Sequence, residues 1–204
     1  MFYVTVRESA MPMDSQRSMI PTLPKPTAFK LRTCLNAKVP LWKIETGVVR
    51  SLTWLADGTV ITLGIWKAGD IVGQALSHIE PYQIECLSQV EATPIFLEPD
   101  QLDASLLLRH LRLQEELVVI RGYRKVDDML LKLLNWLARR FGHSVKTGSV
   151  IDLRLTHQDL AEILGTTRVT ITRILGQFEE QGMIERTSVR RIVLKETETW
   201  HYQI

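Results

Sequence analysis

The chain has 204 residues, of which 45% are hydrophobic and 24% are charged, and its mean hydropathy is 0.00. A chain of this size and composition buries a core without disulfides or metal ions, which excludes disordered, collagen-like and low-complexity proteins. Its unbroken apolar runs are far shorter than the ~20 residues that cross a bilayer, and its N-terminus lacks the pattern of a secretory signal. We therefore expect a cytoplasmic protein of one or two domains that has no membrane partner.

The net charge of +2 is distributed unevenly along the chain. Residues 47–120 carry 4 basic and 10 acidic side chains, whereas residues 121–146 carry 7 basic and 2 acidic ones. An acidic segment followed by a basic one predicts two structural units and suggests a polyanionic partner.

Residues 1–40 hold five of the eight prolines and show little periodicity, which predicts an irregular N-terminal arm. This arm contains Cys34, and the second cysteine of the chain is Cys86. A reducing compartment keeps two such thiols apart, and a redox switch between them is the alternative.

Residues 41–102 consist of short runs rich in β-branched and aromatic residues, separated by turn signals. Asp57-Gly58 lies between two such runs and predicts a type I′ hairpin, since that turn needs positive φ angles. Trp42, Trp54 and Trp66 are spaced by twelve residues, which predicts one inward position on successive strands. We expect a small antiparallel β domain.

Residues 103–126 predict a long helix, because its apolar residues recur at spacings of three and four. They form the stripe Leu106, His110, Leu113, Leu117 and Ile120. This stripe can pack on the β domain, or it can pair with a second copy of the chain, and we prefer the homodimer interface. A further helix is expected from Asp127 to Phe141, ended by Gly142.

Residues 127–204 contain the pattern of a winged helix-turn-helix. Thr156 to Asp159 resembles a capping box, Gly165 allows a tight turn, and a second helix follows from Arg168 to about residue 181. The outer face of that second helix carries hydroxyl and guanidinium groups, which suit phosphates and guanine edges better than a merely solvated face does. A basic hairpin after Gly182 forms the wing, whose arginines suit backbone phosphates; a solvated basic hairpin is the alternative.

We therefore expect double-stranded DNA as a partner, contacted by residues of the helix pair and the wing. The candidate DNA-binding residues are Thr156, His157, Thr166, Thr167, Arg168, Val169, Thr170, Thr172, Arg173, Arg186, Arg190 and Arg191.

The order of these parts over residues 41–196 resembles the Crp/Fnr superfamily of bacterial transcription regulators. Residues 155–176 are most similar to the helix-turn-helix of the cyanobacterial nitrogen-control regulators, and Gly69–Gly73 is similar to the glycine-bounded turn before the superfamily's effector-binding stretch. The resemblance implies an α+β fold: a shortened double-stranded β-helix, or β-roll, of the cyclic-nucleotide-binding type, then a dimerisation helix and a winged helix-turn-helix. It further implies a homodimer on a palindromic promoter site with GTA-like and TAC-like halves, base or phosphate contacts from Arg168 and Arg173, and contact with RNA polymerase.

The chain departs from the cyclic-nucleotide-binding members, because no arginine lies between Arg50 and Arg109 to hold a cyclic phosphate. Binding of cAMP or cGMP is therefore not expected, and the helix position that is basic in 2-oxoglutarate-sensing relatives offers His110, so the effector stays unknown. No catalytic residue, cofactor or metal site is expected, since no histidine, cysteine or carboxylate group has ligand spacing. A small-molecule sensor with conditional DNA binding is the alternative function; an enzyme built on the β domain lacks a ligand set.

Overall fold

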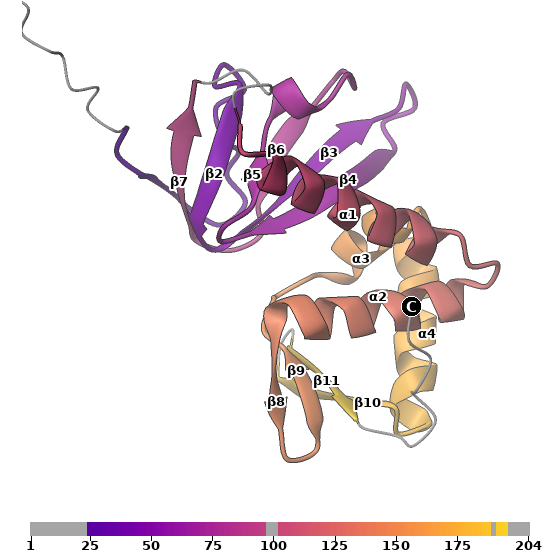
Figure 1. The fold of residues 1–204 in the computed structure, drawn as a ribbon. Helices are drawn as coiled ribbons and strands as arrows, with labels where there is room; N and C mark the ends of the chain where they lie inside the picture. Colours follow the sequence, from indigo (N-terminus) through magenta and orange to yellow (C-terminus); the bar gives the residue numbers. More distant parts are fainter. Residues whose placement is uncertain (1–23, 97–101, 189–190, 196–204) are drawn as a thin grey trace, which may run out of the picture.

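The computed structural model describes residues 24–96, 102–188 and 191–195. A β-roll at the N-terminal end is joined by a long helix to a C-terminal unit of helices and a small sheet (Figure 1). The elements of the roll are β1 (Thr27–Phe29), β2 (Leu41–Thr46), β3 (Val48–Trp54), β4 (Val60–Lys67), β5 (Ile71–Val72), the 3-10 turn η1 (Gln74–Leu76), β6 (Gln83–Cys86) and β7 (Val90–Ile95).

The roll consists of two antiparallel sheets, with strand orders β1-β7-β2-β5 and β4-β3-β6. Ile44 and Val90 from the first sheet share one buried cluster with Val49 and Trp66 from the second. The predicted antiparallel β domain and the α+β fold are therefore confirmed.

The segment before β2 differs from the irregular arm expected for residues 1–40. β1 pairs with β7, the backbone of Cys34 forms an isolated antiparallel β-bridge with Glu85, and Leu35 is only 5% exposed. The reason is that a few β-forming residues between prolines suffice to extend an existing sheet edge. Residues 1–23 of the expected arm lie outside the described part of the chain.

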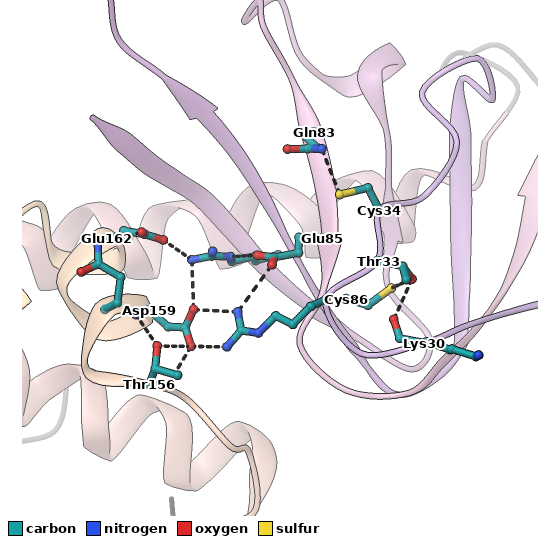
Figure 2. A network of polar contacts seen from close by, with 12 residues as sticks. Lys30, Thr33, Cys34, Gln83, Glu85, Cys86, Thr156, Asp159 and Glu162 are labelled. Carbon is teal, nitrogen blue, oxygen red and sulfur yellow. Dashed lines mark hydrogen bonds and ion pairs between the residues drawn. The ribbon is translucent and has the colours of Figure 1, made fainter. Parts of the chain in front are cut away.

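The two cysteines leave opposite faces of this paired backbone (Figure 2). The Cys34 side chain lies 2.9 Å from Gln83 and is exposed, whereas Cys86 is buried and lies next to Thr33. Cys34 pairs with Glu85, the residue before Cys86, and successive side chains of a strand point to opposite faces. A disulfide between the two thiols would therefore need a backbone rearrangement, which disfavours the redox alternative.

The Asp57-Gly58 hairpin joins β3 to β4, but its turn is not the two-residue type expected. The Leu55 and Thr59 backbones pair, which leaves three loop residues, and only Gly58 has a positive φ, of 83°. Such loops combine a type I turn with one left-handed residue. Trp54, the last residue of β3, is 41% exposed, so the expectation of an inward position fails for it while Trp42 and Trp66 are buried.

The C-terminal unit follows α1 (Ala104–Arg121). Its elements are α2 (Val126–Phe141), β8 (Gly142–Val145), β9 (Gly148–Ile151), α3 (His157–Leu164), α4 (Arg168–Glu180), β10 (Ile184–Ser188) and β11 (Arg191–Lys195). The strands form one antiparallel sheet in the order β10-β11-β9-β8, with α2 and α4 packed nearby (Figure 1). α2 ends at Gly142, as predicted.

The apolar stripe of α1 is buried within its own chain. Leu113 joins a buried cluster of the roll, whereas Leu117 and Ile120, each 1% exposed, join a larger cluster that combines the C-terminal unit with Ile65 and Leu87 of the roll. The His110 ring stacks on Trp66 at a centroid distance of 4.1 Å. The assignment of Leu113, Leu117 and Ile120 to a dimer interface is therefore corrected, because a periodic apolar stripe does not reveal whether its own chain or another copy covers it.

A cluster of ion pairs holds α3 against the roll (Figure 2). Arg50 on β3 is 2.6 Å from Glu85 on β6 and 2.6 Å from Glu162 on α3. Arg32 binds Asp159 on α3 with two hydrogen bonds of 2.8 and 2.6 Å. Charges taken out of water in this way are favourable only when each meets several partners, and here each one does.

Asp159 has two structural roles. It accepts hydrogen bonds from Arg32, and it completes the cap at the start of α3 by accepting from the Thr156 backbone at 2.7 Å. Burial alone raises the pKa of this carboxyl, but the hydrogen bonds from Arg32 and Thr156 outweigh it, so its pKa lies below the ordinary value.

A second contact fixes the other end of α3. Arg121, at the C-terminal end of α1, donates to the Ile163 carbonyl at 2.7 Å and also to the Thr62 carbonyl of β4. Burial lowers the pKa of Arg121. The roll therefore contacts α3 at both ends, and α1 joins the contact at the C-terminal end through Arg121.

Replacing Arg50 with methionine tests the cluster. We expect the Arg50→Met variant to lose about 3 kcal/mol of unfolding free energy at pH 7, because three buried or half-buried carboxylates lose their shared partner. Urea denaturation measures this loss. The Lys43→Met control removes an exposed pair with Glu45 and is expected to cost less than about 1 kcal/mol.

An Arg32→Met variant tests the pH dependence of the cluster, because the hydrogen bonds from Arg32 help to lower the pKa of Asp159. The stabilisation from this pair is present at neutral pH and is lost as the pH falls through the folded pKa of Asp159. The difference in unfolding free energy between wild type and Arg32→Met therefore narrows below about pH 4. A difference that stays constant down to pH 3 contradicts the electrostatic origin.

Candidate nucleic-acid interface

Two short helices and a tight turn form the centre of the site. The Thr156 hydroxyl accepts from the Asp159 backbone at 3.1 Å to begin α3, and Gly165 ends it in the left-handed conformation with a φ of 68°. The Thr167 hydroxyl then accepts from the Thr170 backbone to begin α4. The predicted helix-turn-helix is confirmed, with buried Ala161 at the crossing.

α4 separates its residues by face. Ile171, Ile174, Leu175 and Phe178 are buried on the core side. On the other face Arg168 and Arg173 are exposed, and Val169 is 78% exposed, which is the largest exposure among the described large apolar residues. An exposed valine beside two arginines is an unusual surface for a helix that meets only water.

Several predicted contact residues already bond within the motif. Thr167 and Thr170 share a hydroxyl contact of 2.9 Å, and the Thr172 hydroxyl donates to the Arg168 carbonyl. Thr172 also lies 2.7 Å from His157 Nδ1, which ties α4 to the start of α3. The backbone N–H of Thr166 donates to the Ala161 carbonyl within the turn.

A groove of about 780 Å³ lies between α3, α4 and the wing. It brings together the predicted residues Thr156, His157, Arg168, Arg186 and Arg191. Val169, Thr170, Thr172 and Arg173 do not line it, and Arg190 lies outside the described residues. Burial lowers the pKa of His157, and the cations Arg186 and Arg168 lower it further, which favours the neutral ring.

The wing arginines have acidic partners that the sequence did not reveal. Arg186 Nε is 2.9 Å from Glu179 on α4, and Arg191 is 3.3 Å from Asp152. The hydrogen bond to Glu179 raises the pKa of Arg186. No local signal identifies these partners, because they are 7 and 39 positions away in the chain. Exposed pairs of this kind contribute little, so a phosphate can replace the carboxylate.

In the stretch that resembles the superfamily's effector-binding region, the polar side chains Asp70 and Gln74 already bind other groups of the chain. Asp70 is 2.9 Å from Arg109 and also pairs with Arg140, and the Gln74 amide donates to the carbonyls of Ser77 and Ile79. Burial lowers the pKa of the neighbouring His110.

Over the described residues, no three metal-ligating side chains cluster, and no helix is both long and apolar enough for a bilayer.

Comparison with known proteins gives concordant results. Residues 128–199 match the family model of the Crp-like helix-turn-helix domain. The Regulatory protein CysR of Synechococcus elongatus is 43% identical over 162 residues, which cover 78% of this chain and 78% of that protein. The Global nitrogen regulator of Nostoc sp. is 42% identical over 73 residues, or 35% of this chain and 33% of that protein.

A solved structure extends the likeness of the fold. A transcriptional regulator of the CRP family from Thermus thermophilus superimposes with a TM-score of 0.70 at 22% identity, covering 83% of this chain and 92% of that one. The β-roll, the connecting helix and the helix-turn-helix thus occur together in a known architecture, and the chain belongs to the Crp/Fnr family of DNA-binding transcription regulators.

Proposed function

We propose that the protein acts in the cytoplasm as a homodimer on a palindromic promoter site, with α4 as its recognition helix. The observation that carries this proposal is the outer face of α4, where Val169 is 78% exposed and lies directly beside the exposed Arg168. A helix with such a face fits the major groove, where arginine reads guanine and methyl groups contact thymine.

Arg168 and Arg173 contact different groups of the DNA in this proposal. They are five residues apart, so their directions differ by about 140° around the helix axis and they address different groups. Arg168 lies in the first turn and lines the groove, which favours contact with guanine O6 and N7. Arg173 is 3.1 Å from Gln177, which favours a flanking base or phosphate.

The remaining candidates suit backbone phosphates. Arg186 and Arg191 lie on the strands of the wing, and Arg190 precedes Arg191 in the sequence. The other candidates are at or near the start of the two helices: His157 and the hydroxyls of Thr156, Thr166, Thr167, Thr170 and Thr172. Contacts of this kind orient the protein on the duplex without reading its sequence.

The dimer seam is proposed on another face of α1. Leu108, Leu111, Val118 and Val119 are between 45% and 65% exposed, although all are large apolar side chains. Leu108 occupies an a position and Leu111 and Val118 occupy d positions of a heptad repeat, with Glu115 at the second a position and Val119 at the neighbouring e position. A second copy of α1 is the occupant that such a stripe fits. Leu106 and His110 face the roll beside Trp66, so they are not part of the proposed seam.

Contact with RNA polymerase is part of the proposal on the ground of family membership alone. The alternative function, a sensor whose ligand binding is primary, is less well supported, because Trp66 and His110 stack where α1 meets the roll. No effector is proposed for the interior of the roll.

The base-reading proposal predicts a split between two arginine variants. Arg168→Ala is expected to lose about 1–3 kcal/mol on the preferred site and its preference for guanine at one position. Arg191→Ala is expected to weaken all sequences alike and to lower the salt slope by about one. Competition binding to single-base variants at two salt concentrations measures both. An Arg168→Ala protein that keeps its guanine preference refutes the assignment.

The seam proposal predicts a change in mass. The double variant Leu111→Glu, Val118→Glu is expected to elute as a monomer of 23.4 kDa, because four carboxylates would meet in one seam. Light scattering measures the mass, and a palindromic duplex tests whether tight binding is lost. The matched control Leu55→Glu, Ile79→Glu changes two exposed residues of the roll and is expected to remain a dimer. A dimeric seam variant would place the interface elsewhere.

The ligand analysis predicts that calorimetry with cAMP or cGMP shows no binding in the micromolar range. The physical reason is that the roll offers no arginine between Arg50 and Arg109, while Gln74 is occupied by backbone carbonyls. Micromolar affinity for either nucleotide contradicts this reading of the roll.

A further inference from the structure

A second cavity lies where α1, α2 and the end of β4 meet. It has a volume of about 700 Å³ and shares no lining residue with the DNA-facing groove. Five basic side chains line it, and they come from all three elements: Lys67, Arg109, Arg112, Arg139 and Arg140. This convergence is not explained by DNA recognition at α4 and the wing.

The cations of this cavity are only partly compensated. Arg109 and Arg140 share the single carboxylate Asp70, and Lys67 donates to the Arg140 backbone carbonyl. Arg112 and Arg139 form no ion pair with any residue in the described ranges.

Two carboxylates also line the cavity, and they do not neutralise it. Glu116 accepts a hydrogen bond from the indole of Trp136, and Glu115 has no ion-pair partner among the described residues. Together with Asp70 they set three negative charges against five positive ones.

Arg140 shows most clearly that the cavity lacks negative charge. Its side chain is only 10% exposed, and its buried Nε atom has no hydrogen-bond partner in the described structure. Burial lowers the pKa of Arg140, and the neighbouring Arg109 lowers it further. Such a guanidinium gains when additional negative charge is placed beside it.

We propose that this cavity binds a small anion with at least two negative charges, of the phosphate or pyrophosphate class. Arg112 on α1 and Arg139 on α2 hold it from two sides, and Lys67 and Arg109 contribute from the roll side. Arginine forks match the paired oxygens of phosphoryl groups, and three cations without a carboxylate partner suit a multiply charged ligand better than a single carboxylate. The proposal goes beyond DNA binding and does not depend on it.

The cavity borders the proposed dimer seam, because Val119 belongs to both. An anion in the cavity contacts both helices across the short connection between α1 and α2. It therefore binds best when the two helices keep the relative position described here, and it stabilises that arrangement.

Thermal unfolding of the full chain with sodium pyrophosphate tests the site, with KCl as the partner titration at equal ionic strength. We expect pyrophosphate, but not KCl, to raise the Tm by roughly 5 °C at saturating concentration. The variant Arg112→Gln, Arg139→Gln is expected to fold, since neither side chain has an ion pair to lose, and to bind pyrophosphate at least ten-fold more weakly by calorimetry. The matched control Arg124→Gln, Arg154→Gln removes two exposed arginines outside the cavity and is expected to bind like wild type.

Three outcomes overturn the proposal. One is the absence of any pyrophosphate effect on wild type up to 10 mM, and another is an equal loss of affinity in the cavity variant and the control, which indicates diffuse surface charge. The third is displacement of pyrophosphate by a short DNA duplex, which assigns these cations to the DNA contact. A ten-fold loss confined to the cavity variant, with no competition from the duplex, supports the site.

Discussion

The guanidinium of Arg50 is the group on which the arrangement of the two units depends. It is 7% exposed, it originates on a central strand of the roll, and it meets carboxylates from β6 and from α3. A charge buried to this extent fixes the direction and distance of its partners, because moving any of them leaves an uncompensated ion. Since α3 crosses α4 in a tight turn, the placement of α3 also determines where the exposed face of α4 points.

α1 contributes a second constraint by using one helical face for two cores. Leu113 packs within the roll, while Leu117 and Ile120, one and two turns later, pack in the cluster that joins the C-terminal unit to Ile65 and Leu87 of the roll. α1 thus packs against both units along one face, and other large apolar residues of the helix lie on the surface. The division explains how a helix of 18 residues carries two apolar faces.

Local chemistry explains what the sequence predicted well. The Thr156 cap, the Gly165 turn, the Thr167 cap and the alternation of faces on α4 depend on neighbours within four residues, so the helix-turn-helix was predictable nearly to its boundaries. The order of a small antiparallel β domain, a helix and a basic hairpin followed from periodicity and turn signals, whereas the β-roll was implied by the resemblance to the Crp/Fnr superfamily.

The features that were missed depend on residues far apart in the chain. Arg32 and Asp159 are 127 positions apart, and Arg50 and Glu162 are 112 apart, so no pattern in the sequence pairs them. The same limit applies to α1: its periodicity revealed an apolar stripe but did not show that the roll and the C-terminal unit of the same chain cover it. The wing arginines were correctly placed on a hairpin, but their partners Glu179 and Asp152 became visible only in three dimensions.

The double use of Asp159 has a consequence for how such proteins diversify. Its carboxylate caps the first helix of the helix-turn-helix and at the same time accepts hydrogen bonds from Arg32, which lies between β1 and β2 of the roll. A recombination event that joins this C-terminal unit to a foreign sensor lacking Arg32 and Arg50 leaves Asp159 and Glu162 without their counter-charges. A foreign β domain therefore needs counter-charges at both positions to hold α3 in the same place, because the two parts of the chain share these ion pairs as well as one buried apolar cluster.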